Sequence, residues 1–134
     1  MRAVPLSRYV IFFSIAAAGL AADLATKALE QSRDSGRGVI AAQCLKILGD
    51  VHRHADAFDP QASALHYEQA AELTRSLGMR PLLAHCHLGR GRLFMTMGRP
   101  ADAREQLETA LRLYRDMGML HWPQEVEAAL RELR

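Results

Sequence analysis

A helical period runs through residues 84–119 and is interrupted once, at Gly98-Arg99-Pro100. On both sides of this interruption, small and apolar residues recur at spacings of three and four. They are Leu88, Gly91, Phe94 and Met95 before it, and Ala103, Leu107, Ala110, Leu111 and Tyr114 after it. Such spacing is typical of the buried face of an amphipathic helix. The stretch therefore predicts two helices joined by a tight turn, which is a helical hairpin.

A glycine-centred element recurs with a long period. Leu77-Gly78-Met79 returns 40 positions later as Met117-Gly118-Met119, and a glycine just after the last helical residue is a common helix stop. A fixed period of this size indicates stacked units, because a single hairpin cannot bury its apolar face alone. We predict one domain over residues 1–134, with a partial first unit (1–38), a second unit (39–80), a third unit (81–120) and a capping helix (121–134).

Three element boundaries are also predicted. The partial first unit ends in a turn at residues 35–38, and the next helix begins at Val39. Asp59 before Pro60 favours a helix start at the proline. The apolar period of residues 123–133, with Glu and Arg between, predicts a capping helix whose outer face is polar.

The composition agrees with an all-α fold. Aromatic residues make up only 6% of the chain, and alanine, leucine, arginine and glutamate, which are good helix formers, dominate. The formal net charge is +2, and basic and acidic residues are interspersed along the chain. No basic run indicates nucleic-acid binding, so we expect no nucleic-acid partner.

The two cysteines stand at matching places in successive units. Cys44 and Cys86 should therefore lie on neighbouring helices of one type, which are roughly 10 Å or more apart, whereas a disulfide needs Cα atoms within about 7 Å. Free cysteine is among the most buried residue types. We predict that both are small core residues without a disulfide.

Residues 1–22 allow two interpretations. Arg2 and Arg8 precede an apolar run from Tyr9 to Leu20, and small residues follow, which is the order of a signal peptide. The run also fits a helix of the partial first unit, whose apolar end could support self-association. About 12 residues are too few to cross a bilayer of about 30 Å as a helix, so we expect no stable membrane span. We expect a cytoplasmic protein, or an exported one if residues 1–22 act as a signal.

No residue pattern indicates chemistry. In His85-Cys86-His87, neighbouring side chains on a helix diverge by about 100°, so they cannot bind one metal ion together. The acidic pair Glu105 and Glu108 belongs on a solvated helix face, and no nucleophile triad or glycine-rich phosphate loop is present in the sequence. We predict no catalytic residue, no metal and no cofactor, and hence a protein that is not an enzyme.

The order of residue types resembles the tetratricopeptide repeat. Its first helix carries a small residue and then an aromatic residue three positions later, and its second carries alanine, a large apolar residue and alanine. The corresponding residues here are Gly91, Phe94, Ala103, Leu107 and Ala110. The run from Leu77 to Leu93 is also similar to the C-terminal repeat arrays of large bacterial signalling ATPases and nucleotide cyclases. The resemblance implies a right-handed α-solenoid of antiparallel helix pairs with a capping helix, in which Gly91 lies at a close helix contact.

The same resemblance implies a concave groove lined by the first helix of each unit. Ten positions fall there: Gln43, Lys46, Asp50, Arg53, His54, His85, Leu88, Arg92, Met95 and Thr96. It further implies a non-enzymatic protein-protein interaction module that binds a partner peptide or helix in bacterial signalling or regulation. We expect a partner with acidic or C-terminal groups, and much of the affinity from Leu88 and Met95. The alternatives are an exported cell-envelope adaptor and an effector domain that senses a small ligand.

Overall fold

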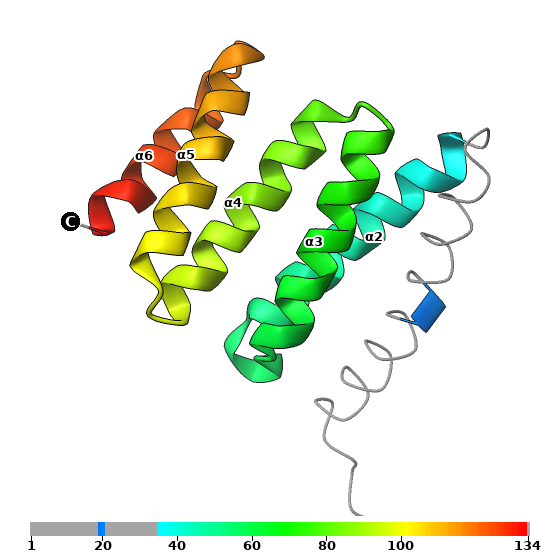
Figure 1. The fold of residues 1–134 in the computed structure, drawn as a ribbon, viewed down its shortest axis with the longest axis horizontal. Coiled ribbons are helices and arrows are strands. Elements are labelled where there is room, and N and C mark those ends of the chain that lie inside the picture. Colours follow the sequence, from blue (N-terminus) through cyan, green and yellow to red (C-terminus); the bar gives the residue numbers. More distant parts are fainter. Residues whose placement is uncertain (1–18, 21–34, 134) are drawn as a thin grey trace, which may run out of the picture.

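The computed structural model describes residues 19–20 and 35–133 (Figure 1). The elements in the long segment are α2 (Ser35–Arg53), the short 3₁₀ turn η1 (Ala55–Ala57), α3 (Pro60–Ser76), α4 (Arg80–Thr96), α5 (Pro100–Asp116) and α6 (His121–Glu132). The described part of the chain contains no strand, which confirms the all-α prediction for it. Figure 1 shows these helices following one another across the molecule in chain order.

Two predictions about the N-terminus cannot be placed on this fold. The signal-like run of residues 1–20 and the second helix of the partial first unit lie, apart from residues 19–20, outside the described residues. Across the residues that are described, no helix combines the length and the apolar character needed to cross a bilayer.

The helices repeat with a 20-residue spacing. Helices α3, α4 and α5 are each 17 residues long and begin at residues 60, 80 and 100. Each is followed by a glycine with φ near +68°, at positions 78, 98 and 118. The amide of the next residue donates back to a carbonyl in the last helical turn, as Met79 N does to Thr74 O at 2.9 Å. These are Schellman turns, which only glycine forms without strain, and they explain the 40-residue repeat as two helices and two turns.

The start of α3 follows from two adjacent residues. Asp59 precedes the helix, and its Oδ1 accepts a hydrogen bond from the backbone N–H of Ala62 at 3.0 Å. Pro60 occupies the first helical position, where its missing N–H costs nothing. The predicted helix start at this proline is therefore confirmed.

The start of α2 differs from the prediction. The sequence placed a turn at Ser35–Gly38 and a helix from Val39, but α2 already begins at Ser35. Gly38 is buried, and a Cβ on it would lie 2.9 Å from Cδ1 of Leu77 at the end of α3. The glycine therefore allows a close helix contact instead of a turn.

The core consists of two clusters, one between α2, α3 and α4 and the other between α4, α5 and α6. Cys86 is fully buried in the first cluster, Cys44 packs half-buried against it, and both are free. The prediction of two unbridged cysteines is thus confirmed. A Cβ on Gly91 would lie 2.7 Å from Cγ of Leu107, so the predicted close contact at Gly91 is confirmed as well.

Candidate functional site: a pocket between α2, α4 and α6

A pocket of about 170 Å³ opens between α2, α4 and α6. It forms because α4 packs on both α3 and α5, α2 also contacts α4, and α6 packs on α5. The residues that line it are Lys46, Asp50, Arg53 and His54 from α2 and the residue after it, His85, Leu88, Gly89 and Arg92 from α4, and Trp122 from α6.

Seven of the ten residues predicted for the groove line this pocket. The other three do not: Gln43 and Thr96 are exposed outside it, and Met95 packs half-buried against the α4–α6 core. The pocket also contains Gly89 and Trp122, which the sequence had not placed there. Trp122 was missed because the period of residues 123–133 predicted only a cap with a polar outer face.

Leu88 lies differently from the prediction. It lines the pocket, but only 3% of its surface is exposed and it belongs to the α4–α6 core. Leu88 therefore has little accessible surface with which to provide the affinity expected of it from the sequence. Leu88 forms the floor of the pocket, and the half-buried Trp122 ring forms its apolar wall.

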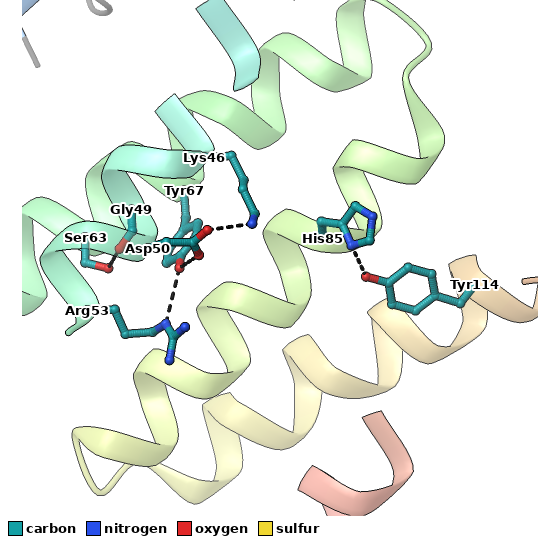
Figure 2. A network of polar contacts seen from close by, with 8 residues as sticks. All are labelled: Lys46, Gly49, Asp50, Arg53, Ser63, Tyr67, His85 and Tyr114. Atoms are coloured by element: carbon teal, nitrogen blue, oxygen red, sulfur yellow. Dashed lines mark hydrogen bonds and ion pairs between the residues drawn. The ribbon is translucent and has the colours of Figure 1, made fainter. Parts of the chain in front are cut away.

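A hydrogen-bonded network fixes the α2 side of the pocket (Figure 2). The Tyr67 hydroxyl donates to Oδ1 of Asp50 at 2.5 Å, and Nζ of Lys46 lies 2.5 Å from Oδ2 of the same carboxylate. Nε of Arg53 donates to the Tyr67 hydroxyl at 3.4 Å. Burial first, and then the hydrogen bond to Asp50 and its charge, raise the pKa of Tyr67 well above its ordinary value. Tyr67 therefore stays protonated and remains a donor.

The ring of Tyr67 extends from α3 to Asp50 and Arg53 because two glycines leave room for it. A Cβ on Gly49 of α2 would lie 2.8 Å from Cδ1 of Tyr67, and a Cβ on Gly89 of α4 would lie 2.5 Å from its Cε1. The Ser63 hydroxyl donates to the carbonyl oxygen of Gly49 at 2.7 Å and ties α3 to α2 beside the ring. Any side chain at either glycine would displace Tyr67 from the network.

Replacing Tyr67 by phenylalanine tests this network. The ring keeps its place, but Asp50 and Arg53 lose their shared partner, so we expect the free energy of unfolding to fall by about 1 to 2 kcal/mol. Urea denaturation of Tyr67→Phe measures this difference. Thr109→Val is a matched control, because it removes a hydroxyl that bonds only within its own helix α5. Equal denaturation midpoints for the Phe variant and the wild type would contradict a stabilising role.

An aromatic cluster fixes the α6 side of the pocket. Nδ1 of His85 and the Tyr114 hydroxyl are hydrogen-bonded at 2.6 Å. The Trp122 ring meets His85 edge-on with centroids 4.5 Å apart and stacks on Tyr114 at 5.9 Å. Burial, and then the charge of Lys46, lower the pKa of His85, so its imidazole is neutral at pH 7. The contact between His85 and Trp122 of α6 is therefore one between two neutral rings.

The charges in the pocket leave one cation without an acidic partner. Lys46 is paired with Asp50, and Nη2 of Arg92 lies 2.8 Å from Oε2 of Glu125 on α6. For Arg53, no carboxylate in the described part of the chain lies within ion-pair distance, and its hydrogen bond there is to the Tyr67 hydroxyl. The pocket therefore has an unbalanced positive charge at its α2 end.

The three side chains of His85-Cys86-His87 lie in three different surroundings. His85 contacts Tyr114, Cys86 is in the core, and Nδ1 of His87 lies 2.8 Å from Oε1 of Gln106. Burial raises the pKa of the Cys86 thiol to about 12, so it is not a thiolate at pH 7. Among the residues that the structure describes, no group of three or more His, Cys, Asp or Glu side chains is placed to hold a metal ion.

A second hollow, of about 300 Å³, lies on α5, and all of its described lining residues come from that one helix. It has no lining from a neighbouring described element, so the pocket between α2, α4 and α6 is the stronger candidate.

Comparison of the chain with models of protein families, with curated proteins and with solved structures finds no match.

Proposed function

We propose that this chain is a non-enzymatic protein-protein interaction module of the tetratricopeptide type. In this proposal α2–α3 and α4–α5 are the antiparallel helix pairs of a right-handed solenoid, and α6 is its cap. The 20-residue helix spacing, the three glycine turns and the contact between α2 and α4 support this arrangement. The resemblance of residues 77–93 to the repeat arrays of bacterial signalling proteins favours a role in signalling or regulation.

The observation that carries the proposal is the pocket shared by α2, α4 and α6. Its walls are built from three helices and combine charged groups with the Trp122 ring, as expected for a site that binds side chains of another protein. Its volume of about 170 Å³ is below the roughly 300–1,000 Å³ of typical small-molecule sites. We therefore favour one or two side chains of a peptide or helix as the occupant over a small effector ligand.

Photo-cross-linking from two positions tests this function. A photoreactive amino acid replaces His54, which is exposed and lines the pocket, or Glu108, which is exposed on α5. In the cell that makes the protein, we expect a discrete protein adduct from position 54 and none from position 108. Both variants keep the core intact, because neither residue is buried.

The pattern of adducts distinguishes the outcomes. A band that forms from position 54, and that disappears when Trp122 is also replaced by alanine, supports binding in the pocket. Adducts of equal yield from both positions, or from position 108 alone, would place any interaction outside the pocket and overturn the proposal.

A further inference from the structure

We infer that the partner presents an acidic side chain from a helix, that its carboxylate binds Arg53, and that a neighbouring apolar side chain of the same helix packs on Trp122. This inference rests on the proposed function and names the chemistry of the partner. It depends on three observations: the orientation of Arg53, the charge balance of the pocket, and the way α6 already docks beside it.

The guanidinium of Arg53 is held ready for a ligand. Its Nε is taken up by the Tyr67 hydroxyl, which Asp50 in turn orients, and the Tyr67 ring lies between two glycines. In Figure 2 the dashed line from Arg53 to Tyr67 starts at Nε, and no dashed line joins the two terminal nitrogens to any of the residues drawn. A planar guanidinium fixed in this way offers paired N–H donors that match the two oxygens of a carboxylate.

The charge balance favours a carboxylate over a phosphate. Arg53 is the only pocket-lining lysine or arginine without an acidic partner among the described residues, because Lys46 and Arg92 are already paired. A single negative charge neutralises it. A phosphate group carries about −1.5 to −2 at pH 7 and would add repulsion from the nearby Asp50 carboxylate.

Helix α6 shows how a helix can satisfy this kind of site. Glu125 binds Arg92 at 2.8 Å, and Trp122, one turn earlier on the same face, packs against His85. An acid and an aromatic residue three positions apart on α6 thus already bind two α4 residues of the pocket, Arg92 and His85. At the α2 end, Asp50 is paired with Lys46 and no carboxylate of the described residues is paired with Arg53, so a partner helix with an acidic and an apolar residue one turn apart complements it.

Selection from a peptide library tests the inference. Random 12-residue peptides, displayed through their C-termini so that every carboxylate comes from a side chain, are selected on the intact protein. We expect the selected peptides to share an Asp or Glu with an apolar residue three or four positions away. Binding of the synthetic peptides, with both ends blocked, is followed by the fluorescence of Trp122, the one tryptophan of the chain.

Matched variants then locate the carboxylate. Arg53→Gln should weaken binding of an acidic peptide about tenfold, or about 1.4 kcal/mol, and Arg53→Lys should restore part of it. The same peptide with Gln in place of its acid should bind wild type and Arg53→Gln equally. Arg104→Gln, the same change of charge at an exposed site on α5, should have no effect.

The results separate this inference from the function on which it rests. If no peptide is enriched, the proposed function fails and the inference fails with it. If peptides are enriched without a shared acid, or if Arg53→Gln binds the acidic peptide as tightly as wild type, the inference is overturned while the proposed function stands.

Discussion

Gly89→Leu is expected to lower the free energy of unfolding by about 3 kcal/mol relative to the wild type. The first added carbon would lie 2.5 Å from Cε1 and Cζ of Tyr67, whose side chain is fully buried. The ring is rigid, and Gly49 on α2 blocks its other face, so relief requires α2 or α4 to move. Overpacking of this kind costs about 1 to 3 kcal/mol, and this contact belongs at the upper end. Urea denaturation followed by circular dichroism measures the effect.

Two further variants test whether the clash with Tyr67 causes the loss of stability. Gly36→Leu makes the same change in α2 where no atom lies within 4 Å, and we expect it to be neutral or to stabilise by up to about 1 kcal/mol. In a Tyr67→Leu background, where the ring is gone, Gly89→Leu should cost clearly less. An equal cost with and without the ring would assign the effect to something other than Tyr67.

The sequence was sufficient for the helices and their turns because both depend on local chemistry. Gly78 and Gly118 marked helix ends, since a positive φ there excludes most other residues, and Asp59-Pro60 marked a helix start. The spacing of apolar residues then set which helix face is buried. Seven pocket residues were predicted from the resemblance to the tetratricopeptide repeat, which implies that the same faces of α2 and α4 line a groove.

The sequence was insufficient where a residue's role depends on its neighbours in space. Tyr67 and Leu107 occupy equivalent places opposite Gly49 and Gly91, yet only the tyrosine has a hydroxyl that reaches Asp50. One signal was available: a tyrosine between two glycine-containing helices indicates a ring that needs room. The position of Trp122 depends on how α6 packs on α5, and the period of α6 alone does not determine this.

Leu88→Asp is expected to unfold the protein and not merely to weaken binding. The side chain is 3% exposed and packs in one cluster with Leu107 and Tyr114, so the aspartate would place a carboxylate against buried apolar side chains. Losses above about 4 kcal/mol are expected for such a change, against a total stability of about 5 to 15 kcal/mol for a typical domain. We expect a loss of the cooperative thermal transition, measured by circular dichroism.

Thr96→Asp is the matched control, because it places the same charge on an exposed position of α4 and should shift the melting temperature by little. A folded, cooperative Leu88→Asp protein would contradict the burial of Leu88 and return it to the groove surface, where the repeat pattern had placed it. If Leu88→Asp unfolds as expected, loss of partner binding in that variant carries no information about the groove. The contact surface must then be mapped through residues that can change without unfolding the protein, of which Arg53 and His54 are the most direct.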